Sequence, residues 1–174
     1  MPAPAVRDGI VYVTEDRKVE GFFETKSIAD NIYLGFLAKL RGGRKLVSKR
    51  EASQVGEQFI KRLNIRAISK DVKAIELSGG NQQKLVIAKS LVQEPEVIIF
   101  DEPTRGVDVN AITEIHQLIN QLADEGKAVV VISSYLPEVM ALSDRILVCR
   151  MGKVVEEFSA LEATEEKIMY AAIH

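Results

Sequence analysis

The sequence predicts an α/β protein in which a parallel-sheet core carries a helical subdomain. Residues 95–174 alternate apolar strand patterns with helical patterns, which is typical of a parallel sheet. Residues 27–94 are instead almost entirely helical in pattern. The length of 174 residues is enough for one domain with a core of its own. We therefore expect a strand and loop over 9–26, the helical subdomain over 27–94 and the rest of the core over 95–174.

The first half begins with one strand and continues with helices. The segment GIVYVTE (9–15) is apolar, β-branched and aromatic, so it predicts a short buried strand, and a charged loop follows it. A helical pattern begins at Ser27, and the run RGGRK (41–45) breaks it. Ser48 has the character of an N-cap, with Glu51 at the capping-box position, and predicts the start of the next helix.

The second half supplies most of the predicted sheet. The run EVIIFDE (96–102) is continuously apolar until it ends in two carboxylates, which is typical of a central parallel strand. The predicted elements around it are a helix from Ser78 to about Val92, a helix over 109–125, a strand over 127–134, a short helix over 135–144, a hairpin over 145–158 that turns at Met151-Gly152, and a helix over 164–172.

Composition excludes several classes of protein. Hydrophobic residues make up 47% and charged residues 28%, which fits an ordinary globular protein, and no apolar run approaches the roughly 18 residues that span a bilayer. The net charge of −2 gives no electrostatic reason to expect nucleic acid as a partner. The single cysteine, Cys149, lies in the apolar run RILVCR, so we expect a buried structural thiol in a reducing compartment.

A pair of carboxylates, Asp101 and Glu102, marks the end of the central strand. Open α/β sheets bind ligands at the carboxyl ends of their strands. One carboxylate there could bind Mg²⁺ through water, and the other could orient or deprotonate an attacking water. Taken alone, the same residues also fit a strand-ending turn with two solvated acids.

The segment ELSGGNQQK (76–84) places two glycines in the first turn of a predicted helix. Glycine costs about 1 kcal/mol relative to alanine inside a helix. The N-terminus of a helix presents unpaired N–H groups, so Gly79 and Gly80 would let a phosphate approach the backbone and the Ser78 hydroxyl would add a donor. The alternative is that Ser78 is only an N-cap and the glycines form a loose turn.

Three segments together, LSGGNQQK, VIIFDEPTRGVD and SSYLPE, resemble the ATP-binding cassette of ABC transporters. The resemblance extends over nearly the whole chain. It is closest to the second, C-terminal cassette of the double-cassette ATPases that drive bacterial import of simple sugars such as ribose, galactose or xylose. It implies a partial P-loop NTPase, or RecA-like, core with the ABC helical subdomain.

The resemblance also implies a role for each matching position. The signature motif, which contacts an ATP held by another cassette, would consist of Leu77, Ser78, Gly79, Gly80 and Asn81. Asp101 would lie on the Mg²⁺ side, and Glu102 would be the catalytic carboxylate. Asp108 would lie in the D-loop at the dimer interface.

Two positions depart from the pattern of the family. Glu15 falls where most cassettes carry the Q-loop glutamine, and Ser134 falls where most carry the switch histidine. Both also fit a simple role as a polar residue at the end of a strand. If they match the family positions, they weaken hydrolysis at this cassette's own site.

The phosphate-binding sequence G-x-x-x-x-G-K-[S/T] does not occur in the 174 residues. The nearest cluster, RGGRKLVS (41–48), has the wrong spacing and follows a predicted helix rather than a strand. We therefore interpret the chain as the C-terminal part of a cassette, and we expect it to be inactive by itself.

The resemblance implies ATP and Mg²⁺ as cofactors and a place on the cytoplasmic face of the bacterial inner membrane. The implied partners are the N-terminal cassette of the same polypeptide or a second ATPase copy, the membrane permease and, indirectly, a periplasmic sugar-binding protein, with no nucleic acid. Alternatives are a nucleoside-import ATPase, a soluble ABC ATPase outside transport, and a fragment that serves only for dimerisation through its signature.

Overall fold

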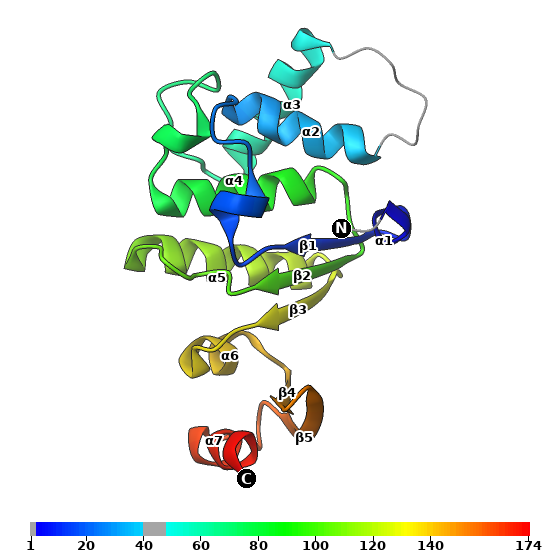
Figure 1. The fold of residues 1–174 in the computed structure, drawn as a ribbon, viewed down its shortest axis with the longest axis vertical. Helices are drawn as coiled ribbons and strands as arrows, with labels where there is room; N and C mark the ends of the chain where they lie inside the picture. The colour runs from blue at the N-terminus through cyan, green and yellow to red at the C-terminus, as the bar shows by residue number, and fades with distance from the viewer. Residues whose placement is uncertain (1–2, 40–47) are drawn as a thin grey trace. The chain divides into compact units, whose positions relative to one another are not determined.

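The computed structural model describes residues 3–39 and 48–174, so the predicted helix break at 41–45 lies outside the described part. The chain divides into two compact units, Met1–Val130 and Val131–His174. The α/β class predicted from the sequence is confirmed (Figure 1). In the part of the chain described, no helix combines the length and the apolar character needed to cross a membrane.

The first unit contains the parallel sheet. Strand β1 (Ile10–Val13) pairs in parallel with β2 (Val97–Asp101), in a register that runs from Ile10 opposite Val97 to Val13 opposite Phe100. Strand β3 (Ala128–Ile132) begins in this unit and completes the order β1-β2-β3 (Figure 1). The apolar side chains of Val13, Ile98 and Phe100 are fully buried. The sheet therefore brings the carboxyl ends of β1 and β2 to one edge.

Three long helices lie in the segment predicted as a helical subdomain: α2 (Ile28–Lys39), α3 (Lys49–Arg62) and α4 (Gly79–Leu91) (Figure 1). The predicted cap of α3 is confirmed, since Ser48 Oγ accepts the N–H of Glu51 at 3.3 Å. The Glu51 carboxylate accepts a hydrogen bond from the Tyr33 hydroxyl on α2. This hydrogen bond links α2 to the first turn of α3.

Helix α4 is the centre of the first unit. Its apolar side chains Leu85, Ile87 and Ala88 have no exposed surface. Its polar residues Gln82, Gln83, Lys84 and Ser90 are buried as well. A helix that is buried around most of its circumference holds its N-terminus in a fixed place relative to its neighbours.

Glycine at position 35 allows α2 to pack closely on α4. A Cβ atom built there would lie 2.0 Å from the carbonyl oxygen of Lys89. We expect Gly35→Ala to lower the free energy of unfolding by about 1–3 kcal/mol, because one helix must move away from the other. Urea unfolding measures this, and the exposed substitution Asn120→Ala on α5 (Val109–Asp124) is the control. A Gly35→Ala protein as stable as the control would contradict this packing.

Three short helical turns lie next to longer elements in the described part of the first unit. A five-residue helix, α1 (Ala3–Arg7), precedes β1, and a 3-10 turn, η2 (Ala74–Glu76), precedes α4. The charged segment after β1 forms a π-helical turn, η1 (Arg17–Gly21), which corrects the predicted loop. The Asp16 side chain accepts the N–H groups of Lys18 and Val19 and so starts that turn.

The second unit consists of α6 (Leu136–Leu142), β4 (Arg145–Arg150), β5 (Lys153–Ser159) and α7 (Glu165–Ile173). The predicted hairpin is confirmed: β4 and β5 are antiparallel, and Met151 and Gly152 at the turn have φ values of 49° and 74°. These left-handed values are typical of a type I′ turn. The Thr164 hydroxyl caps α7 by accepting the N–H of Lys167.

The core of the second unit is small, and Cys149 lies outside it. Ile146 and Val148 of β4 pack with Ile168 of α7. The register of β4 shifts between Val148 and Cys149, and Cys149 is exposed. The predicted burial of this thiol is therefore wrong, because the alternation of the strand puts its buried face at Ile146 and Val148.

Candidate functional site

The predicted carboxylate pair lies at the end of β2, where β1 also ends. Asp101 is the last residue of β2, and its Oδ2 accepts a short hydrogen bond from the Tyr12 hydroxyl on β1. This hydrogen bond raises the pKa of Tyr12 above its ordinary value. Glu102 follows with φ of 47°, a left-handed conformation that is uncommon for a residue with a side chain. At this end of the strand, the Tyr12 hydroxyl therefore orients the Asp101 side chain, and the backbone turns sharply at Glu102.

The turn after these carboxylates is attached to the segment that follows β1. Arg17 donates from Nη1 to the carbonyl oxygen of Arg105 at 2.7 Å and from Nη2 to that of Gly106 at 2.9 Å. Glu15, predicted at the Q-loop position, forms an ion pair with the Arg105 side chain. Burial lowers the pKa of the Arg17 guanidinium. Neither arginine was predicted as a site residue: Arg17 lies in the segment predicted as a charged loop, and Arg105 carries no role of its own in the motif VIIFDEPTRGVD.

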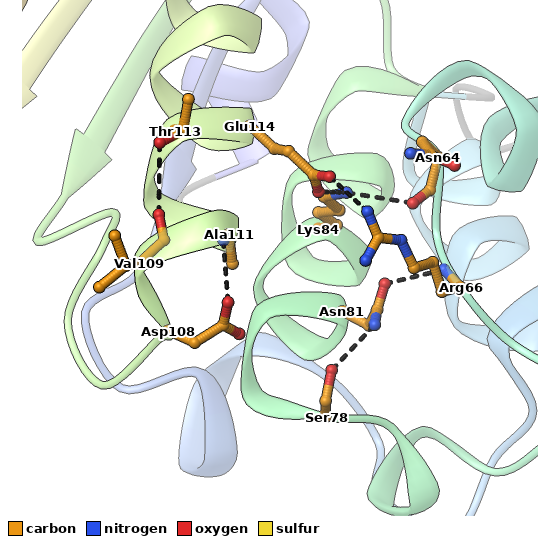
Figure 2. Close-up of polar contacts among 10 residues, drawn as sticks. All are labelled: Asn64, Arg66, Ser78, Asn81, Lys84, Asp108, Val109, Ala111, Thr113 and Glu114. Atoms are coloured by element: carbon orange, nitrogen blue, oxygen red, sulfur yellow. Dashed lines mark hydrogen bonds and ion pairs between the residues drawn. The ribbon is translucent and has the colours of Figure 1, made fainter.

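The side chains of the predicted signature form a local hydrogen-bonded group. Ser78 is the N-cap of α4 by its backbone angles, but its side chain makes no capping hydrogen bond to the helix. Instead, Asn81 Nδ2 donates to Ser78 Oγ at 2.8 Å, and Asn81 Oδ1 accepts the backbone N–H of Arg66 at 2.8 Å (Figure 2). Ser78 is therefore the N-cap residue by position, but its hydroxyl is held by the Asn81 side chain one turn along and not by a backbone N–H of the helix.

The two glycines of the signature approach the turn that precedes α5. A Cβ atom on Gly80 would lie 2.4 Å from Cβ of Ala111, the third residue of α5. A Cβ on Gly79 would lie 3.1 Å from the carbonyl oxygen of Gly106. Neither glycine has a positive φ, so close packing within the chain, rather than backbone conformation, requires them. This is a second reason for the glycine pair, and the sequence alone did not reveal it.

Charged side chains connect α4 to α5 next to these glycines. Glu114 of α5 forms ion pairs with Lys84 of α4 and, at 2.7 Å, with Arg66, while Lys84 also donates to the carbonyl oxygen of Asn64 (Figure 2). The Lys84 side chain is only 5% exposed. The predicted D-loop residue Asp108 caps α5 by accepting the N–H of Ala111 at 3.1 Å. The ends of α4 and α5 are therefore joined by packing and by charge.

The Glu114 carboxylate should give the protein a pH-dependent part of its stability. The hydrogen bond from Lys84 holds the pKa of Glu114 below its ordinary value, so this contribution is complete above the ordinary value of 4.5 and is lost as the pH falls through the folded value. We expect Glu114→Gln to lower the free energy of unfolding at pH 7 by about 2–3 kcal/mol, because Lys84 loses a charged partner. Urea unfolding of both proteins from pH 7 to pH 3 measures the difference, which should shrink with falling pH. A constant difference would contradict the ion pair.

An open pocket lies beside the predicted signature. Its volume is about 280 Å³, and it is lined by residues of the Arg66 loop and by the start of α4, including Leu77, Ser78 and Asn81. Ser78 itself is exposed. The hydroxyl of Ser78 is therefore accessible to a ligand from outside the chain, while Gly79 and Asn81 next to it are partly exposed and Gly80 is buried.

The remaining predicted residue, Ser134, lies in the second unit between β3 and α6, so its role at the switch position stays a prediction.

Among residues 3–39 and 48–174, no three His, Cys, Asp or Glu side chains lie together as a metal site. Mg²⁺ needs only one or two carboxylates besides water and phosphate. Asp101, with one oxygen bound by Tyr12, fits that limited role.

Comparisons with known proteins agree with this geometry. Residues 2–105 match the family model described as ABC transporter. The chain is 47% identical over 168 residues to the ribose import ATP-binding protein RbsA 2 of Agrobacterium fabrum, which covers 97% of the chain and 33% of that protein. It is 46% identical over 171 residues to the xylose import ATP-binding protein XylG of Geobacillus kaustophilus, and the match covers 98% of the chain and 34% of that protein. The chain thus spans about a third of the length of these curated relatives.

Solved structures share the fold. A dimeric ATP-binding cassette, MJ0796, in a post-hydrolysis state with ADP and Pi has a TM-score of 0.72 and 26% identity, covering 88% of this chain and 64% of that one. The ATP-binding cassette MJ1267 of an ABC transporter has a TM-score of 0.78 and covers 99% of this chain and 72% of that one; at 22% identity it supports the fold alone.

Proposed function

Because this chain belongs to the ABC transporter family, we propose that it is the C-terminal part of a cassette in an ATPase that energises import of a simple sugar. Within that ATPase it supplies the signature side of an ATP site whose phosphate loop lies in another cassette. The observation that carries the proposal is the exposed Ser78 at the start of α4, whose hydroxyl is hydrogen-bonded by Asn81 beside an open pocket. The same sequence contains no phosphate loop of its own.

The start of α4 suits an anion that approaches from outside. The first N–H groups of a helix have no partner within it, and the aligned peptide dipoles place partial positive charge there. The Ser78 side chain does not cap these groups. A terminal phosphate held by another cassette would therefore meet backbone donors and one hydroxyl. A related cassette is known as a dimer bound to ADP and Pi, which supports this arrangement.

The carboxylates at the end of β2 would serve a different ATP site from the one that the signature completes. Asp101 would hold Mg²⁺ through water, with its orientation fixed by Tyr12. The ion would neutralise charge that develops on the phosphates during hydrolysis. Glu102 would orient and deprotonate the attacking water, and Ser134 would replace the usual switch histidine. With Glu15 and Ser134 both differing from the common residues, we propose that this second site hydrolyses ATP more slowly.

The proposed partners follow from the function. They are the N-terminal cassette of the same polypeptide or a second ATPase copy, the membrane permease and, through it, a periplasmic sugar-binding protein. We place the ATPase at the cytoplasmic face of the bacterial inner membrane. Similarity to both ribose and xylose import proteins supports a sugar over a nucleoside as the transported class.

The 174-residue chain alone should show no measurable ATP hydrolysis. Nothing in its sequence provides the loop that holds the β- and γ-phosphates, so Glu102 has no correctly placed substrate. Release of phosphate by the purified chain with Mg²⁺ and ATP measures this, with Glu102→Gln as the matched control. Turnover that Glu102→Gln removes would show that the chain holds its own nucleotide, and the proposal would then be wrong.

A further inference from the structure

The side-chain amide of Asn81 has only one orientation that suits both of its neighbours. The backbone N–H of Arg66 lies 2.8 Å from one terminal atom of this amide, and an N–H can only donate. That atom is therefore the oxygen, and the amide nitrogen faces Ser78 Oγ at 2.8 Å. An amide nitrogen can only donate, so the serine oxygen must accept (Figure 2).

This orientation decides what the Ser78 hydroxyl can offer to a ligand. A hydroxyl has one proton and two lone pairs, and one lone pair here is taken by the Asn81 amide. The Ser78 proton cannot point at Asn81, where another proton already lies. The side chain also makes no capping bond to α4. The hydroxyl is thus left to donate away from Asn81, and Ser78 is exposed and lines the open pocket.

Arg66, whose backbone N–H binds the Asn81 oxygen, is itself held in place by its side chain. Arg66 Nη2 donates to Glu114 Oε1 at 2.7 Å, and Glu114 also pairs with the buried Lys84 of α4. The backbone N–H that fixes the Asn81 oxygen therefore belongs to a residue whose side chain is paired with α5 at Glu114, the same carboxylate that Lys84 of α4 binds. Such support is what keeps a hydrogen-bonding side chain in one orientation.

We propose that Asn81 is a positioning residue that makes Ser78 a dedicated hydrogen-bond donor to the phosphate of a nucleotide held by another cassette. This inference rests on the proposed function and adds to it a role for the fifth residue of the signature. Asn81 need not contact the nucleotide. It acts by occupying the acceptor side of the serine oxygen, which leaves the proton for the anion.

Asn81→Asp tests the proposal in the intact ATPase because it keeps the shape of the side chain and reverses its hydrogen bonding. A carboxylate can still accept from Arg66, but it also accepts from Ser78, so the serine proton turns away from the phosphate. We expect kcat for ATP hydrolysis to fall at least about tenfold, since a hydrogen bond to a charged group is lost. The melting temperature should stay level or rise, because an acid in the first turn favours a helix.

A double-mutant cycle separates the hydrogen bond from the added charge. In the Ser78→Ala background, Asn81→Asp changes only the charge. The fold decrease in kcat that it causes there should be at least about tenfold smaller than the fold decrease it causes with Ser78 present. Asn120→Asp, an equal change at an exposed position of α5, should leave kcat within about twofold.

Equal costs of Asn81→Asp in the two backgrounds would overturn the positioning role, as would a kcat that does not change. The proposed function is tested separately by Ser78→Arg. If Ser78→Arg abolishes hydrolysis but the cycle shows no coupling, only the role of Asn81 fails. If Ser78→Arg leaves hydrolysis normal, the trans site and the role of Asn81 fail together.

Discussion

Ser78→Arg is expected to abolish ATP hydrolysis and sugar uptake by the intact ATPase without unfolding this chain. The long side chain would fill the space in front of the first turn of α4, so a phosphate could no longer reach the helix N–H groups. Removal of one donor to a developing oxyanion typically costs about 100-fold or more in kcat, and here the whole contact is blocked. Because Ser78 is exposed, the larger side chain has room outside the core.

The measurements are phosphate release by the purified ATPase and uptake of the labelled sugar by cells. Gln54→Arg, which adds the same side chain at an exposed position of α3, is the control and should leave both rates unchanged. Circular dichroism should show equal melting temperatures for the two variants. A Ser78→Arg protein that hydrolyses ATP and transports sugar at the normal rate would show that this signature contacts no nucleotide.

The second large effect is expected from Gly80→Ala, together with its rescue. The new methyl group would lie 2.4 Å from Cβ of Ala111, so α4 and α5 must separate at the signature. We expect a loss of about 1–3 kcal/mol in the free energy of unfolding, as for other overpacked positions. The activity of the intact ATPase should fall as well, because the N-terminus of α4 moves.

The matched partner substitution is Ala111→Gly, which removes the methyl group on the other side. The double variant Gly80→Ala with Ala111→Gly should recover most of the lost stability, apart from about 1 kcal/mol for glycine in a helix. Urea unfolding of both single variants and the double variant gives the coupling energy. If the two losses simply add, the glycine does not serve the contact with Ala111, and a role toward the nucleotide alone would explain it.

The sequence predicted the elements that depend on local pattern. The parallel strands, the cap at Ser48 and the turn at Met151-Gly152 are confirmed because each follows from a periodicity or a turn preference within a few residues. The turn η1 was missed because it begins with a single Asp16 side chain bonding to nearby N–H groups, which gives no apolar period. Cys149 was assigned wrongly because its strand lies in a small unit with one buried face.

For the candidate site, the sequence predicted the residues of the motifs but not the side chains that support them. The positions of Ser78 and Asp101 were predicted, but the side chains that support them come from distant parts of the chain. Tyr12 is 89 residues away from Asp101 along the chain, and Arg17 is equally far from Gly106. No periodicity in one sequence relates such pairs, because only the parallel pairing of β1 with β2 brings them together.

The central claim is that the start of α4 serves a nucleotide held by another cassette. Backbone amide signals of Gly79 and Gly80 in the isotope-labelled 174-residue chain test it most directly. The chain is mixed in turn with Mg²⁺ and ATP, with the purified N-terminal cassette, and with both together. We predict that both signals shift only in the complete mixture, and that Ser78→Arg removes the shift. Equal shifts with Mg²⁺ and ATP alone would contradict the account.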